Sequence, residues 1–159
     1  MEPRMGPPMI VSACLAGCAC RFDGSPDTED ALARLVADGG AVMVCPEEEG
    51  GLATPRSPAE IVGGDGHDVL AGRAKVVTDR GEDVTDAYLE GARIALAAAR
   101  AAGARTAVLK ARSPSCGKGV IYDGSFSGTR REGDGVTVAL LKQNGIDVVS
   151  DEEFRAAPS

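Results

Sequence analysis

Three cysteines of this 159-residue chain, Cys14, Cys45 and Cys116, each follow a short apolar run. The runs cover residues 9–13, 41–44 and 106–110. If these runs are parallel strands, the three thiols emerge at the carboxyl edge of one sheet, where open α/β folds bind their ligands. Three converging thiolates with no evident fourth protein ligand predict a metal or cluster site that keeps one coordination position open.

The ligand type narrows the choice of metal, because thiolates select zinc, copper(I) or an iron–sulfur cluster. The chain has one histidine, His67, in a Gly-Asp-Gly-His turn, and we interpret it as an exposed loop residue rather than a zinc ligand. Cys18 or Cys20 can in principle complete a four-thiolate site, although both follow Cys14 in a tight loop. A [4Fe–4S] cluster on three thiolates keeps one iron free to act as a Lewis acid toward a soft atom such as sulfur. Taken singly, each cysteine can also be an ordinary buried residue.

Two polar residues close to these cysteines are candidates for moving protons. Glu47 lies two residues after Cys45, and we expect it to be a general acid/base. Ser113 lies three residues before Cys116 and can hydrogen-bond a substrate or a water, although a serine before a proline is also an ordinary turn residue.

Further charged and polar side chains are candidates for binding a substrate. Arg56 and Lys110 can orient a carbonyl or phosphate group through charge-assisted hydrogen bonds. The alternatives are an ion pair between Arg56 and Glu60 and a Lys110 that faces solvent. We also expect Ser115, directly before the third cysteine, to contact the substrate.

The elements that position these residues follow from the apolar pattern. The predicted strands are 9–13, 41–44, 73–78, 106–110 and 146–149, and the predicted helices are 31–36, 84–102 and 136–143. Ser25-Pro26 is expected to begin the first helix, and Gly39-Gly40 to end it. Asp83 or Thr85 is expected to cap the second. Residues 45–66 are rich in Pro, Gly and Glu and are predicted to form a long functional loop.

The resulting order is largely β-α-β-α-β-α-β. This order predicts a single three-layer, Rossmann-like α/β domain with a mainly parallel sheet. We expect the domain to cover residues 1–159, with residues 1–8 as a flexible N-terminal tail.

Composition excludes several classes of protein. The net charge of −7 argues against a large nucleic-acid-binding surface, which is normally basic. No stretch reaches the ~18 to 20 apolar residues of a membrane span, and the start lacks the pattern of a signal peptide. We therefore expect a cytoplasmic protein without a membrane partner, whose cysteines stay reduced.

Several motifs occur in order along nearly the whole chain. They are VSACLAG at 11–17, CRFDG at 20–24, CPE at 45–47, SPSCG at 113–117, IYDGSF at 121–126 and GDGVT at 133–137. Together they resemble the thiouracil desulfidase family, which was long filed as a domain of unknown function. The chain departs from the family pattern at Cys18, which is extra, and at Phe22, where the family often has tyrosine.

The resemblance implies a [4Fe–4S] cluster held by Cys14, Cys45 and Cys116. It also implies a non-redox, hydrolytic reaction, in which a thiolated pyrimidine of the thiouracil or 4-thiouridine type yields the oxo-pyrimidine and sulfide. Glu47 and Ser113 stand at positions that look like the proton-handling residues of the family. The expected partner is this small-molecule substrate. A thiolated tRNA and the oligomeric state are left open.

Two other functions are alternatives to a desulfidase. A cysteine phosphatase needs a cysteine followed by five residues and an arginine, but Arg21 lies one position too far from Cys14, and carboxylates that repel phosphate follow Cys45. A non-catalytic iron–sulfur or redox-sensing module is the stronger alternative. Three ligands beside an acid favour substrate chemistry, because an electron carrier more naturally has four ligands.

Overall fold

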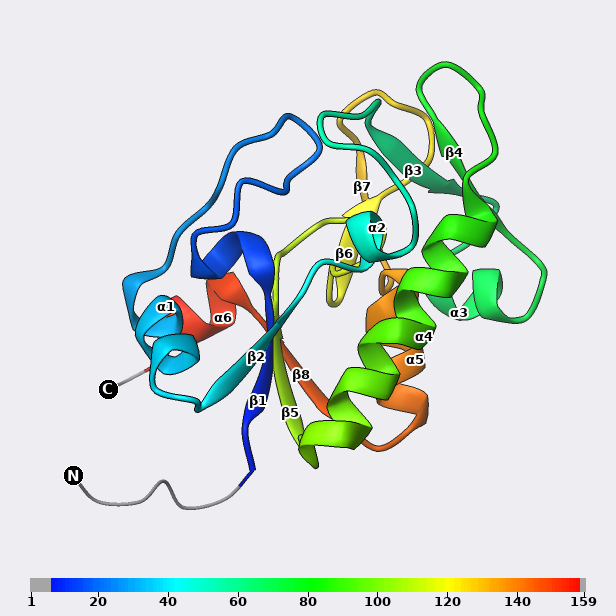
Figure 1. Ribbon diagram of the computed structural model, residues 1–159. Helices are drawn as coiled ribbons and strands as arrows, with labels where there is room; N and C mark the ends of the chain where they lie inside the picture. The colour runs from blue at the N-terminus through cyan, green and yellow to red at the C-terminus, as the bar shows by residue number, and fades with distance from the viewer. Residues whose placement is uncertain (1–6, 158–159) are drawn as a thin grey trace.

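A four-stranded parallel sheet forms the centre of the protein, whose computed structural model describes residues 7–157 (Figure 1). The strand order is β2-β1-β5-β8. The strands are β1 Met9–Ser12, β2 Ala41–Val44, β5 Thr106–Leu109 and β8 Asp147–Ser150. All neighbouring pairs are parallel, so the carboxyl ends of the strands meet at one edge of the sheet. The prediction of a parallel sheet is confirmed.

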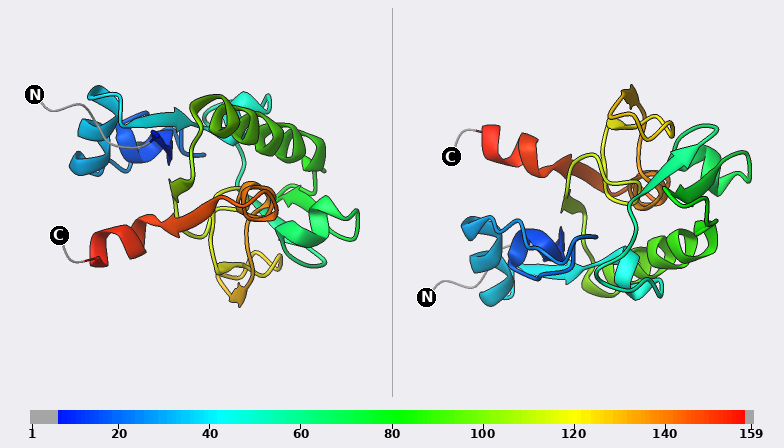
Figure 2. Two further views of the ribbon diagram at one scale, coloured as in Figure 1. Left: turned by 90° about the horizontal axis from the view of Figure 1, so that it is seen from below. Right: turned by 90° about the horizontal axis from the view of Figure 1, so that it is seen from above.

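Helices cover both faces of this sheet, which gives the predicted three layers (Figure 2). Helices α1 (Asp30–Ala37) and α6 (Asp151–Ala156) lie on one face, and α4 (Thr85–Ala102) and α5 (Val136–Gln143) on the other. Because side chains alternate along a strand, adjacent residues of β1 enter different cores. Ile10 packs in the core under α4 and α5, and Val11 in the core under α1.

Two antiparallel hairpins lie beyond the carboxyl edge of the sheet (Figure 1). They are β3 (Ala59–Val62) with β4 (Lys75–Thr78), and β6 (Val120–Tyr122) with β7 (Arg130–Glu132). Helix α3 (Gly66–Leu70) connects β3 to β4. A third apolar cluster, with Ile61, Val76, Tyr88 and Ile121 among its members, packs these hairpins against α4.

Some local predictions were wrong. Residues 45–66 are not a continuous loop, because they include helix α2 (Pro46–Glu49) and strand β3. Ser25-Pro26 does not begin α1, whose N-cap is Glu29. Val84 rather than Asp83 or Thr85 is the N-cap of α4, although the Asp83 carboxylate accepts a hydrogen bond from the Thr85 backbone. Helices α3 and α6 and the second hairpin were not predicted, since each is too short for a periodic pattern.

Other boundaries agree with the sequence to within one or two residues, among them those of β1, β2, β4, α4 and α5. Most of the predicted tail over residues 1–8 lies outside the described residues. Within residues 7–157, no helix combines the length and the apolar character needed to cross a bilayer.

Two glycines allow the short helix α2 to approach α4 closely. A Cβ atom at Gly91, in α4, would overlap the carbonyl of Pro46, the first residue of α2. A Cβ atom at Gly50, at the end of α2, would in turn overlap the carbonyl of Ala87 in α4. Contact at backbone distance therefore fixes α2, and with it Glu47, against the longest helix.

We expect Gly91→Ala to lower the free energy of unfolding by about 1–3 kcal/mol, because the new methyl group must displace α2. Urea denaturation of the purified variant measures this loss. Ala97→Gly, at an exposed position of the same helix, is the control. It exchanges the same two residues in the opposite direction and is expected to lower the stability by the difference in helix propensity alone, about 1 kcal/mol. An unchanged or raised stability of Gly91→Ala would show that α2 yields without cost.

Candidate functional site

A pocket of about 340 Å³ lies where β1, β2 and β5 end. This volume is within the ~300–1,000 Å³ of small-molecule sites. Its walls include all three predicted cysteine ligands and several of the predicted polar residues. They are Cys14, Cys45, Cys116, Glu47, Arg56, Lys110 and Ser113. The fold therefore brings together residues that are up to about a hundred positions apart in the sequence.

Each cysteine of the trio Cys14, Cys45 and Cys116 comes from a different strand end. Cys14 lies in a turn of 3₁₀ helix, η1 (Ala13–Ala16), that continues β1. Cys45 follows β2 as the N-cap of α2, and Cys116 lies in the loop after β5. Cys14 and Cys116 are buried, while Cys45 is half-buried. The predicted convergence of the three thiols on one pocket is found.

The spacing of the trio does not suit a single ion. A tetrahedral zinc with Zn–S bonds of 2.3 Å holds its sulfurs about 3.8 Å apart. Among the residues that the structure describes, the three sulfurs of the trio do not all lie within 4.8 Å of one another. A polynuclear cluster, which bonds each thiolate to a different metal atom, tolerates such a spread.

Burial controls the charge of these thiols. It raises the pKa of Cys14 to about 12, although the nearby Lys110 ammonium opposes the shift. Burial also raises the pKa of Cys116. Cys45 differs, because a hydrogen bond from the Cys20 thiol lowers the pKa of Cys45. At neutral pH the two buried thiols are therefore protonated in the metal-free protein, and metal binding must release their protons.

The Glu47 carboxylate is the centre of a hydrogen-bond network. Its Oε2 atom accepts hydrogen bonds from Arg56 Nε at 3.0 Å and from the Tyr88 hydroxyl at 3.1 Å, and it lies 2.8 Å from Arg56 Nη2 in an ion pair. Its Oε1 atom accepts from the Ser113 hydroxyl at 3.1 Å. The side chain of Glu47 is only 15% exposed, so the carboxylate faces the pocket in a fixed orientation.

Ser113 joins this acid to the loop that carries Cys116. Its Oγ atom accepts hydrogen bonds from the backbone N–H groups of Ser115, at 3.0 Å, and Cys116, at 3.1 Å. With its acceptor positions used, the hydroxyl has its proton free to donate to Glu47. The predicted turn role and the predicted site role of Ser113 therefore occur together.

The substrate-binding candidates have different surroundings. Arg56 pairs with Glu47 rather than with Glu60, and its Nη2 also donates to the Cys20 carbonyl at 3.1 Å. Lys110 lines the pocket, and its side chain is 19% exposed. The Lys110 ammonium is paired with Asp27 at 2.8 Å and with Asp151 at 3.3 Å, so it is not the solvent-facing lysine of the alternative interpretation.

Ser115 lies behind the pocket wall. It is fully buried, its hydroxyl is 2.8 Å from that of Thr137, and it is not among the residues that line the pocket. The same hydroxyl lies 3.8 Å from the Cys116 sulfur. We therefore leave Ser115 out of the proposed substrate contacts and consider it a support for Cys116.

Tyr88 was missed as a site residue. It lies on the apolar stripe of α4 and is almost fully buried, which explains why the sequence pattern indicated only a core residue. Its hydroxyl needs a partner when buried, and Glu47, 41 positions earlier, supplies it. His67, in contrast, belongs to α3 and pairs with Asp134 at 2.9 Å, outside the pocket.

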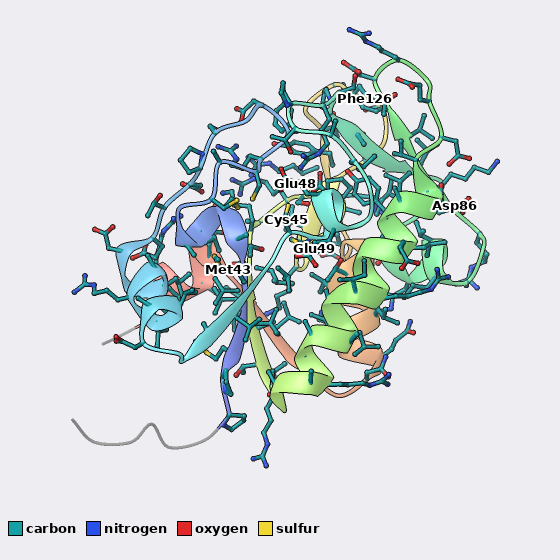
Figure 3. The ribbon with its side chains drawn as sticks, viewed as in Figure 1. Met43, Cys45, Glu48, Glu49, Asp86 and Phe126 are labelled. Carbon is teal, nitrogen blue, oxygen red and sulfur yellow. The ribbon has the colours of Figure 1, made fainter. Side chains whose placement is uncertain are left out.

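Figure 3 shows Cys45, the N-cap of α2, close to Glu48 and Glu49 of the same helix. The Glu49 carboxylate accepts a hydrogen bond from the Cys45 backbone N–H at 2.9 Å and so stabilises the first turn of α2. A proline at the first helical position followed by three glutamates is a helix-start pattern, which was the unused signal for this helix.

Three comparisons relate this chain to known proteins. A family model described as 2-thiouracil desulfurase matches residues 9–153. The uncharacterized protein YbbK of Bacillus subtilis (strain 168) is 53% identical over 146 residues, which cover 92% of this chain and 97% of that protein. A solved structure of the [4Fe-4S]-dependent thiouracil desulfidase TudS (DUF523Vcz) is 43% identical and superposes with a TM-score of 0.82 over 94% of each chain.

Proposed function

Because this chain belongs to the 2-thiouracil desulfurase family, we propose that it converts a thiolated pyrimidine, of the thiouracil or 4-thiouridine type, to the oxo-pyrimidine and sulfide. The observation that carries the proposal is the single pocket that combines three thiols from separate strand ends with a held carboxylate. The named activity of TudS, which shares this fold at 43% identity, supports it.

We assign the ligands of a [4Fe–4S] cluster to Cys14, Cys45 and Cys116. The donor set fits such a group, since all three thiols line the pocket and their spacing is too wide for one ion. The dependence of TudS on a [4Fe-4S] cluster supports the same assignment. When bound by three thiolates, the cluster supplies one iron without a protein ligand, a Lewis acid suited to a thiocarbonyl sulfur.

The proposed reaction is a hydrolysis. Water adds its oxygen to the carbon of the C=S group, the C–S bond breaks, and the products are the C=O group and hydrogen sulfide. No electrons are exchanged with another reactant. Glu47 takes a proton from the water and returns a proton to the departing sulfur, which is the role of a general acid/base.

The neighbours of Glu47 prepare it for this role. The Arg56 guanidinium and the Tyr88 hydroxyl hold Oε2, while Oε1 has the weaker neutral donor Ser113. We therefore propose that Oε1 is the oxygen that exchanges protons with water and substrate. Lys110 is another cation of the pocket wall, and we propose that it attracts the polar edge of the pyrimidine.

Anaerobically reconstituted protein tests the proposal directly. Incubation with 2-thiouracil, 4-thiouracil, 4-thiouridine or its monophosphate is expected to release one sulfide per oxo-pyrimidine, without added oxidant or reductant. A thiolated tRNA tested in parallel decides whether a macromolecular substrate is used. An iron-loaded protein that releases no sulfide from any of these compounds would favour the non-catalytic iron–sulfur module instead.

A further inference from the structure

Two cysteines that the proposed reaction does not use lie beside the pocket. The sulfurs of Cys18 and Cys20 and a carboxylate oxygen of Glu48 all lie within 4.8 Å of one another. The two cysteines belong to the segment after η1, whereas Glu48 lies on α2. The fold, and not only the short Cys-x-Cys spacing, therefore creates this group.

We propose that Cys18, Cys20 and Glu48 form a second metal site, which binds one thiophilic divalent cation of the zinc class. Two thiolates and a carboxylate are ordinary zinc ligands. Tetrahedral zinc needs its donor atoms about 3.5–3.8 Å apart, so a shift of about 1 Å in flexible side chains closes this group around an ion. The trio of cluster ligands lacks this property, because its sulfurs lie farther apart.

The surroundings of the site suit the entry and retention of an ion. Cys18 is half-buried and open to solvent, while Cys20 is buried. The Cys45 thiol donates a hydrogen bond to the Cys20 carbonyl, with Sγ and O 3.8 Å apart. A water molecule can take the fourth position.

An ion at this site would link two walls of the pocket. Cys20 and the two residues after it, Arg21 and Phe22, line the pocket from a segment without helix or strand. Glu48 follows Glu47 on α2. The Arg56 guanidinium already links these two walls, because it binds both the Cys20 carbonyl and the Glu47 carboxylate. The bound ion would add metal–ligand bonds as a second link between the walls, beside the contacts of Arg56.

Zinc titration of the cluster-loaded protein tests the proposal. Under anaerobic conditions with a phosphine reductant, which keeps the thiols free, the protein is expected to bind one equivalent of Zn²⁺ without losing iron. Cys18→Ser and Glu48→Gln should each weaken zinc binding at least tenfold at unchanged iron content. Glu90→Gln, an exposed carboxylate of α4, is the matched control and should bind zinc like the parent protein.

Cobalt(II) provides an independent spectroscopic readout. Bound Co²⁺ is expected to give a sulfur-to-metal charge-transfer band that weakens in Cys18→Ser and persists in Cys14→Ser. Zinc binding that is unaffected by both Cys18→Ser and Glu48→Gln would overturn the proposal. Binding of zinc only as iron leaves the protein would also overturn it, since the ion would then occupy the trio. Neither readout depends on desulfuration, so the two proposals fail separately.

Discussion

The Cys116→Ala variant, reconstituted without oxygen, is expected to retain no stable iron–sulfur cluster and to release sulfide from thiouracil at the background rate. The native thiol is buried, and the loop that carries it is held by Ser113. The two remaining thiolates, Cys14 after β1 and Cys45 after β2, cannot replace the missing ligand. We expect a fall in activity of at least about a thousandfold, because the chemistry of the proposed cluster disappears with it.

Iron, acid-labile sulfide and visible absorbance measure the loss of the cluster. Cys18→Ser is the matched control, because it removes a thiol close to the pocket that lies outside the trio, and its iron content should equal that of the parent protein. Far-ultraviolet circular dichroism confirms that Cys116→Ala is folded. A full iron content in Cys116→Ala would remove Cys116 from the ligand set and leave the three-ligand assignment without support.

Glu47→Gln is expected to keep its cluster and to lose about 10²–10⁴-fold in kcat, the usual contribution of a general acid/base. Glutamine has nearly the same shape as glutamate but exchanges no proton at neutral pH. The experiment measures kcat for sulfide release together with the iron content of the same sample. Turnover at the parental rate, with iron unchanged, would assign the proton transfer to another group.

Tyr88→Phe separates the position of Glu47 from its chemistry. The variant deletes one hydrogen-bond donor to Oε2 and leaves the carboxylate and the Arg56 pair in place. Its effect on kcat should be far smaller than that of Glu47→Gln. Equal losses in the two variants would mean that the orientation of the acid, and not its proton, limits the reaction.

The centre of the fold and the cysteine trio could be predicted because their signals are local. Each strand of the sheet is a short apolar run, and each cysteine of the trio follows such a run directly or after a short turn. The parallel arrangement then dictates that the three junctions share an edge. Glu47 could be found by its position two residues after Cys45, without knowledge of its partners.

The partners themselves could not be predicted, since they depend on how distant elements approach. Arg56 pairs with Glu47 instead of Glu60, because β3 directs Glu60 toward the loop between β6 and β7. There the Glu60 carboxylate accepts hydrogen bonds from the backbone N–H groups of Gly124 and Phe126. Tyr88 has the sequence signature of a core residue, and only the close contact of α2 with α4 shows that its hydroxyl has a role.

Ser115, which we expected to contact the substrate, is not among the residues that line the pocket. Its neighbourhood in sequence suggested a pocket residue, but side chains in a tight turn point in different directions. Ser113 and Cys116 face the pocket, and Ser115 faces Thr137 at the start of α5. The pairing of Cys18 and Cys20 with Glu48 was likewise invisible, because residues 45–66 were expected to form an irregular loop rather than to begin with a helix.

The trio draws on both halves of the hydrophobic interior. Cys116 belongs to the core beneath α4 and α5, while Cys14 belongs to the core beneath α1, on the opposite side of the sheet. A cofactor held by both cysteines would join the two cores at the carboxyl edge of the sheet. Its binding would require both cores to be assembled, because each core supplies only part of the ligand set. Loss of the cofactor would therefore remove a stabilising link from both cores at once.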